Sequence, residues 1–393
     1  MKISNFVNQD IFTKTTKTLR SKDFIFFVVT VLIMVIMVIF GSRSSLWQTP
    51  ERNPTDAHFL SGRVREVIED NTGVNEVGAR VGTQLLRVEL RQGEHRGETI
   101  TVQNRLFPIE HAIHAQIGDR VLVFFQPGSA DSLEGYFSHL QSYDRTIGIY
   151  IIITAFVALL ITVFGKSGLR AAFGLVFTIV MLVFFLLPLV ALGFPPGILT
   201  VLSAVVIVIV SIIAIMGFGK KTLASILGSC FGILCYVLFY FLITFVLRLD
   251  GFNISQIDTL IIAGVGIGVR ELLFSSILIT SLGGIMDVAV SLASAIFELS
   301  QSLKKPTFKV LLKSGMKVSR DIIGSSANTL ILAFTGSFLI SLILFAITNT
   351  NYQVLVNRVD IGIEILRAFA ASSAMIVCAP VTVLISASKF AKS

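Results

Sequence analysis

An acidic residue, Asp287, stands near the middle of a long apolar run, residues 272–297. It belongs to a set of small and polar residues that recur every three or four positions, so that in a helix they share one face. The members of this set, which we call the Asp287 stripe, are Ser276, Thr280, Gly284, Asp287, Ser291, Ser294 and Glu298. An ionised Asp at the centre of a bilayer costs about 2.5–3.5 kcal/mol on insertion scales. We therefore expect the Asp287 stripe to point inward, towards protein or water rather than lipid.

A second set of polar residues lies within residues 319–337. Its members, which we call the Asp321 stripe, fall on one helical face and are Asp321, Ser325, Asn328 and Thr335. The basic connection 303–320 joins the two predicted helices, so the helices can be antiparallel neighbours. We expect this arrangement to bring three residues of each helix together, namely Asp287, Ser291 and Ser294 with Asp321, Ser325 and Asn328.

Together these side chains have the chemistry of a relay for protons or cations. Carboxyl groups inside a membrane, with hydroxyl and carboxamide groups around them, mark the ion pathways of transporters. The predicted ion or substrate path consists of Thr280, Asp287, Ser291, Ser294, Asp321, Ser325 and Asn328. Two other interpretations stay open. Small and polar residues also serve close helix packing, and Asp321 can be an acid that the dipole of a helix N-terminus favours.

The composition is that of a polytopic membrane protein. Of the 393 residues, 54% are hydrophobic and 14% are charged, and the mean hydropathy is +0.83, which is too apolar for a soluble protein of this length. The net charge of +8 is divided among separate loops, so we expect the lipid bilayer and no nucleic acid as a partner. Three cysteines inside apolar segments indicate neither disulfides nor a zinc site, and we expect no metal and no cofactor.

Hydropathy predicts an all-α bundle of about eight transmembrane helices, each long enough to cross roughly 30 Å of hydrocarbon. The predicted spans are 24–40, 147–164, 171–192, 197–216, 222–247, 272–297, 322–347 and 368–388. The first span is an anchor that follows a basic N-terminus, residues 1–23, and residues 145–393 hold the other seven. The apolar segment 258–269 is too short to cross, so we interpret it as re-entrant or interfacial.

One face of the predicted span 222–247 carries a GxxxG pair. The residues on this face are Ser225, Gly228, Gly232, Tyr236 and Tyr240. Glycines at this spacing let a second helix come close, so the pattern indicates close helix packing.

The lysines predict the orientation in the membrane. If the basic N-terminus is cytoplasmic, alternation of eight spans places every lysine of the chain, and the C-terminus, on the cytoplasmic side. Residues 41–144 then lie outside the cell membrane, and they contain no lysine.

Residues 41–144 read as a small β-rich domain inserted after the first span. Short β-branched runs predict strands at 58–70, 83–93, 98–104 and 119–127, and residues 91–97 predict a hairpin loop. Such a meander suits an OB-like or SH3-like barrel. Glu110, His111 and His114 are close enough in sequence to share an ion, but a single cluster also fits ordinary surface histidines, which we prefer.

Two stretches resemble the YibE/F family of bacterial multi-pass membrane proteins. They are SLGGIMDVAVSLASAIFEL at 281–299 and SGMKVSRDIIGSSANTLILAFTGS at 314–337. The resemblance implies a bacterial cytoplasmic membrane and pairing with a shorter, YibF-like membrane subunit that lacks the outer domain; a homo-oligomer is the other possibility. The family supplies no settled substrate and therefore no site residues.

The sequence contains no nucleotide motif and no nucleophile with an attendant base, so we expect no enzyme. We predict a permease-like membrane protein with a polar path between the spans 272–297 and 322–347, and we leave coupling to a proton or another ion open. The alternative is a non-transporting membrane scaffold or envelope assembly factor whose outer β domain binds a partner.

Overall fold

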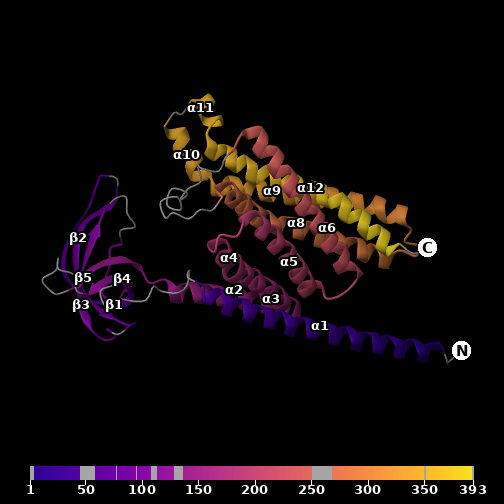
Figure 1. Cartoon of the computed structure of the whole chain (residues 1–393), viewed down its shortest axis with the longest axis horizontal. Coiled ribbons are helices and arrows are strands. Elements are labelled where there is room, and N and C mark those ends of the chain that lie inside the picture. Colours follow the sequence, from indigo (N-terminus) through magenta and orange to yellow (C-terminus); the bar gives the residue numbers. More distant parts are fainter. Residues whose placement is uncertain are drawn as a thin grey trace. The chain divides into compact units, whose positions relative to one another are not determined.

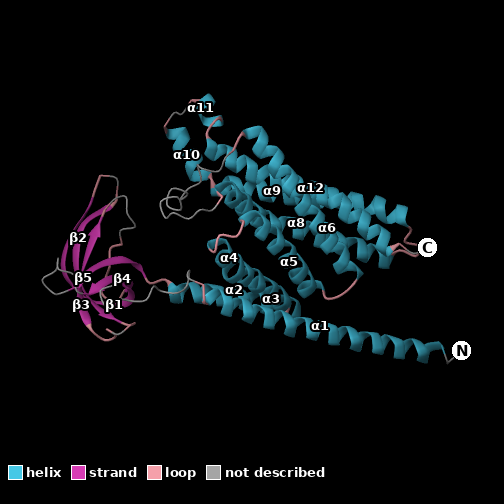
Figure 2. Ribbon diagram, viewed as in Figure 1, coloured by secondary structure: helices cyan, strands magenta, loops and turns pink. Residues whose placement is uncertain are grey.

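The computed structural model is mostly helical and has two compact units (Figures 1 and 2). One unit comprises residues 49–163, and the other comprises residues 1–48 and 164–393. The structure describes residues 4–44, 58–76, 78–93, 95–107, 113–127, 136–249, 268–348 and 351–391, and of residues 4–22 and 58 only the backbone.

The helices follow one another along the chain with short connections. They are α1 (Ser4–Ser42), α2 (Thr146–Phe164), α3 (Lys166–Val180), the π-helical segment η1 (Met181–Leu186), α4 (Leu187–Ala191), α5 (Pro196–Met216), α6 (Lys220–Leu247), α8 (Val269–Ser302), α9 (Phe308–Ser337), α10 (Leu339–Ile347), α11 (Tyr352–Val356) and α12 (Val359–Phe390). In the part of the chain that is described, seven helical stretches are long and apolar enough to cross a membrane, counting α3, η1 and α4 as one.

The eighth predicted span, 322–347, is not one straight helix. It is formed by the end of α9 and by α10, which are bent by 54° at their junction. α9 also begins at Phe308, so the connection that we predicted as 303–320 is only residues 303–307. The basic stretch is helical because its lysines recur every four residues on the exposed face, while Leu311, Gly315 and Ser319 are buried on the other.

The predicted re-entrant segment 258–269 falls almost entirely outside the described residues, since description resumes at Gly268, the residue before α8.

The core of the helical unit lies where α6, α8 and α12 meet. Helix α6 turns its glycines towards α12: a Cβ atom at Gly232 would lie 3.2 Å from Cys378 Cβ, and a Cβ atom at Gly228 would collide with Thr382. On the same face of α6, Tyr236 donates a hydrogen bond to the carbonyl oxygen of Phe274 in α8, at 3.1 Å. The close packing predicted for this face of α6 is therefore confirmed.

The other unit contains a closed β-barrel of five strands (Figure 2). The strands are β1 (His58–Val74), β2 (Arg80–Leu90), β3 (Thr99–Leu106), β4 (Arg120–Pro127) and β5 (Tyr136–Tyr143), and their order around the barrel is β1-β2-β3-β5-β4. All neighbours are antiparallel except β3 and β5, which are parallel. Five strands closed in this way match the OB-like alternative.

Four of the five strands were predicted from the sequence, and so was the connection 91–97 between β2 and β3. Their alternating residues fill the barrel, with Leu86, Val88, Val102 and Val121 fully buried. The fifth strand, β5, was missed. Its inward side chains are Ser138 and Leu140, so its sequence shows little apolar alternation.

Candidate functional site

Helix α8 presents two different faces along its 34 residues. The apolar face is buried against the neighbouring helices, and its fully buried members include Leu273, Ile277, Leu278, Ile285, Leu292 and Ile296. The opposite face carries the Asp287 stripe. Ser276, Thr280, Asp287, Ser291 and Glu298 are exposed, whereas Ser294 and Gly284 are half-buried.

The expectation that the Asp287 stripe points into the bundle is therefore wrong for this chain by itself. The orientation of α8 follows from the shape of its neighbours. The side chain of Ile285 fills the space above Gly232 of α6, because a Cβ atom at Gly232 would lie 2.5 Å from Ile285 Cγ2. Apolar residues of α8 thus fit the small residues of α6 and α12, and the polar stripe faces outward.

The hydroxyl groups of the stripe are satisfied within α8 itself. Ser276 donates to the carbonyl oxygen of Leu273 at 2.9 Å, and Thr280 donates to the carbonyl oxygen of Ser276 at 2.8 Å. The carboxylate of Asp287 makes no hydrogen bond or ion pair with any residue that the structure describes. Asp287 is consequently the member of the stripe whose polar group still needs a partner.

The Asp321 stripe is exposed too. Asp321, Ser325, Asn328 and Thr335 all lie on the solvent- or lipid-facing side of α9, while the buried face of α9 is made by Leu311, Gly315, Ser319 and Phe334.

Helices α8 and α9 are neighbours, as predicted (Figure 1). Their contact runs through buried residues, because a Cβ atom at Gly315 would lie 3.0 Å from Ile296 Cδ1. Among the described residues, no hydrogen bond or ion pair connects the Asp287 stripe with the Asp321 stripe. The two polar stripes therefore lie on one molecular surface without closing a path between them.

The buried polar residues of the helical unit lie elsewhere, and the sequence analysis did not identify them as a group. They form a seam on α5, α6 and α12, with Ser203, Ser211, Ser229, Ser372, Cys378, Thr382 and Ser386 all buried. The hydroxyl groups of Ser203, Ser229 and Ser386 have no hydrogen-bond partner among the described residues. Small residues at steps of three and four from Ala368 to Ser386 were the signal for this seam on α12.

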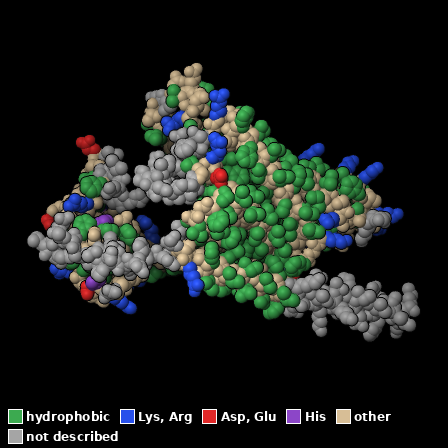
Figure 3. Space-filling view, viewed as in Figure 1, with side chains coloured by type: hydrophobic (Ala, Val, Ile, Leu, Met, Phe, Trp, Pro, Cys, Tyr) green, Lys and Arg blue, Asp and Glu red, His purple; other side chains and the backbone are tan. Residues whose placement is uncertain are grey.

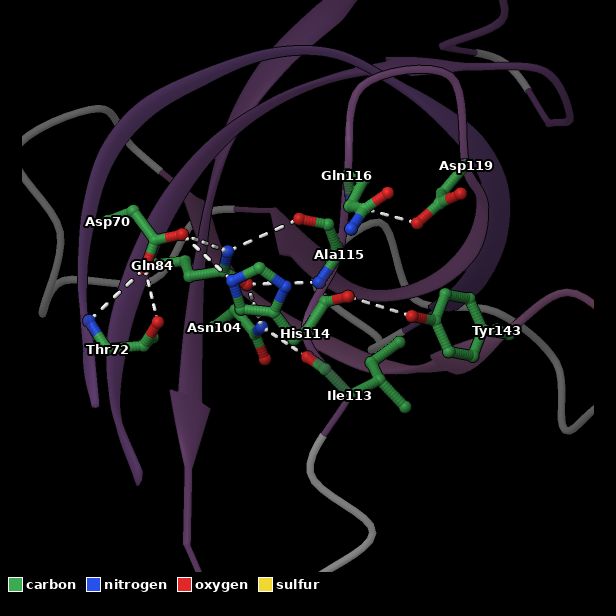
Figure 4. A network of polar contacts seen from close by, with 10 residues as sticks. All are labelled: Asp70, Thr72, Gln84, Asn104, Ile113, His114, Ala115, Gln116, Asp119 and Tyr143. Atoms are coloured by element: carbon green, nitrogen blue, oxygen red, sulfur yellow. Dashed lines mark hydrogen bonds and ion pairs between the residues drawn. The ribbon is translucent and has the colours of Figure 1, made fainter. Parts of the chain in front are cut away.

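A polar network fixes the segment 113–119 of the barrel (Figure 4). The buried amide of Gln84 donates to Asp70 at 3.0 Å and accepts from Asn104 at 2.9 Å, and His114 lies 2.9 Å from Asp70. Thr72 donates to Asp70 at 2.6 Å. These hydrogen bonds, chiefly that of Thr72, lower the pKa of Asp70 to about 2.

Of the residues weighed as a shared ion site, Glu110 and His111 lie outside the described residues, and His114 belongs to this network. Within the described ranges, no group of three His, Cys, Asp or Glu side chains is placed to hold a metal ion.

The outer surface of the barrel carries an aromatic patch, formed by Phe59 of β1, Phe124 of β4, and Phe137 and His139 of β5. The Phe124 ring lies 5.4 Å from that of Phe59 and stacks on His139 at 4.7 Å. Phe59 is 56% exposed and Phe137 is 42% exposed. Exposed aromatic clusters of this kind are typical of binding surfaces.

The comparison with protein-family models gives one match. The model described as YibE/F-like protein matches residues 152–392, which include both polar stripes. No curated protein and no solved structure matches the chain.

Proposed function

We propose that this chain, which belongs to the YibE/F-like family, is a permease-like subunit whose polar path along α8 is completed by a neighbouring protein chain. The family and the apolar helices fit an integral membrane protein. The observation that carries the proposal is the exposed Asp287 stripe. Leaving Asp287 ionised against lipid would cost about 2.5–3.5 kcal/mol, so protein or water must cover it in the membrane.

The length of the stripe supports a path rather than a local packing contact. Ser276 and Glu298 are 22 residues apart in one helix, which corresponds to about 33 Å at 1.5 Å per residue. The hydrocarbon core of a bilayer is roughly 30 Å thick. Polar groups thus recur along α8 over the whole thickness of a membrane, as a route for an ion or a small polar solute requires.

The path in this proposal uses both stripes. Asp287 is the protonatable group, the α8 hydroxyls flank it, and the polar residues of α9 shape the cytoplasmic half. The residues concerned are Thr280, Asp287, Ser291, Ser294, Asp321, Ser325 and Asn328. No bond is made or broken in the transported solute, so the protein in this proposal is not an enzyme.

The distribution of lysines supports an orientation with both termini in the cytoplasm and the barrel outside. Lys220, Lys304, Lys305 and Lys389 stand at the ends of α6, α8 and α12. Figure 3 shows Lys and Arg side chains gathered at that end of the helical unit, beyond an apolar surface. By the positive-inside rule this end faces the cytoplasm of a bacterial cell membrane.

The proposal is tested by proton flux into vesicles that contain the purified protein and a trapped pH-sensitive dye. Under an imposed pH gradient we expect flux from the wild type, and at least a tenfold loss with Asp287→Asn and Asp287→Ala. Asp360→Asn is the matched control, because this acid is also in a predicted span but is paired with Arg358 at 2.8 Å. Equal flux from the wild type and both Asp287 variants would remove the relay.

A membrane scaffold is the second candidate function, and the aromatic patch of the barrel favours it. A scaffold needs a binding surface on its outer domain and no conducting route, so Phe59 and Phe137 would hold an envelope partner. Wild-type vesicles whose flux equals that of empty vesicles would favour this candidate.

A further inference from the structure

The exposed charges of α8 and α9 complement each other. On α8 the exposed acids are Asp287 and Glu298, and on α9 the exposed cations are Lys313, Lys317 and Arg320. None of these five forms an ion pair within the described part of the chain. We infer that a second copy of this chain covers the stripes, with α8 of each copy packed along α9 of the other.

The depths of these charges agree with this pairing. α8 ends at Ser302 and α9 begins at Phe308, so both helices start their count from the same membrane surface. At 1.5 Å per residue, Glu298 lies about 6 Å and Asp287 about 22 Å from that end of α8. On α9, Lys313 lies about 8 Å and Arg320 about 18 Å from the corresponding end. Glu298 thus meets Lys313, and the long side chain of Arg320 reaches Asp287.

A twofold axis along the membrane normal produces both contacts at once. In such an isologous interface, α8 of one copy meets α9 of its partner, and the same contact is made a second time. Packing α8 against α8 would instead set two Asp287 carboxylates at one depth, where like charges repel. The acid on the α9 face, Asp321, is outnumbered by the three cations, so the contact remains attractive.

The stripes also have room for close approach. A Cβ atom at Gly283 of α8 or at Gly324 of α9 would meet no atom within 4 Å. Small residues on the exposed face of a membrane helix let a second backbone come near, which strengthens the contacts between polar side chains. The interface deepens the proposed function, because it names the chain that covers the path.

Disulfide cross-linking between two differently tagged copies in the same membrane tests the pairing. One copy carries Ser294→Cys and the other carries Lys317→Cys, residues that lie at about 12 Å and about 14 Å from the shared end of the helices. The control replaces Ser294→Cys by Leu238→Cys, a position of α6 that is 68% exposed. We expect at least tenfold more mixed dimer from the stripe pair than from the control pair.

Charge exchange tests the register. Asp287→Arg is expected to reduce cross-linking at least tenfold, and adding Arg320→Asp to the same chain is expected to restore it. The inference is overturned if stripe and control pairs cross-link equally, if neither does, or if the double exchange restores nothing. A shorter family member in place of the second copy would give the result without cross-links. Cross-linking in vesicles without flux would leave the dimer standing and remove the permease, so the two can fail separately.

Discussion

Placing a methyl group at Gly228 perturbs the contact between α6 and α12 with little other change. A Cβ atom at this position would collide with Thr382 Oγ1 and lie 3.0 Å from Thr382 Cβ and 3.1 Å from Thr382 Cγ2. Thr382 is fully buried and donates a hydrogen bond to the carbonyl oxygen of Cys378 at 2.9 Å. Because its side chain has no free space to turn into, the two helices must separate in Gly228→Ala.

Two opposing terms set the size of the effect. Alanine is more favourable than glycine inside a helix by up to about 1 kcal/mol, whereas overpacking a well-packed core costs about 1–3 kcal/mol. Gly336→Ala is a matched control, because a Cβ atom at Gly336 of α9 would meet no atom within 4 Å. The control receives the helix term alone. We therefore expect Gly228→Ala to have a free energy of unfolding about 1–3 kcal/mol below that of Gly336→Ala.

The thiol of Cys378 reports the separation of the two helices. It is fully buried, and its Sγ donates to the carbonyl oxygen of Gly228 at 3.1 Å. With Cys230→Ser and Cys235→Ser as the background, a thiol-reactive fluorophore records when heating in detergent exposes Cys378. We expect a lower midpoint for Gly228→Ala and an unchanged or higher midpoint for Gly336→Ala. Equal midpoints for the two variants would refute the tight packing of α6 on α12.

Two further predictions concern single hydrogen-bonded groups. Since hydrogen bonds hold the pKa of Asp70 at about 2 instead of 3.8, the barrel should be most stable above pH 3.8 and lose stability as the pH falls towards 2. The loss should be at most about 1 kcal/mol, because a third of this side chain is exposed to screening solvent; urea midpoints of barrel peptides, followed by pulsed hydrogen exchange, should show it in the wild type and not in Asp70→Asn. Tyr236→Phe removes the hydrogen bond to Phe274 and should cost about 0.5–1.5 kcal/mol in the Cys378 assay, whereas Tyr150→Phe, at a 65% exposed position, should cost nothing.

Hydropathy and strand alternation predicted most of the fold. The apolar runs predicted seven helical stretches, and four strands followed from alternating residues such as Leu86 and Val88. The limits of this reasoning are local. Strand β5 escaped because one apolar residue, Leu140, points into the barrel, and the helix at 308–320 was taken for a loop because its lysines hid an amphipathic pattern.

The candidate site shows what periodicity cannot decide. Spacing places Asp287 and Ser291 on one face of α8, and the structure agrees, but spacing does not say which face meets the rest of the bundle. That choice depends on the partner helices. Gly232 of α6 leaves a space that Ile285 fills, and this complementarity lies between residues that are far apart in the sequence.

The outward orientation of the Asp287 stripe changes what the chain must do in a membrane. In water, hydrophobic burial would explain why the apolar face of α8 is inside, but lipid tails solvate apolar side chains as well as protein does. Packing of shapes therefore decides the interior, and it leaves polar groups on the surface wherever a second surface can take them up. An unpaired carboxylate that costs about 2.5–3.5 kcal/mol in lipid drives association with a surface that carries cations at the same depth. Lys317 and Arg320 of α9 provide such a surface, so the feature that makes one copy unfavourable alone is the feature that selects its partner.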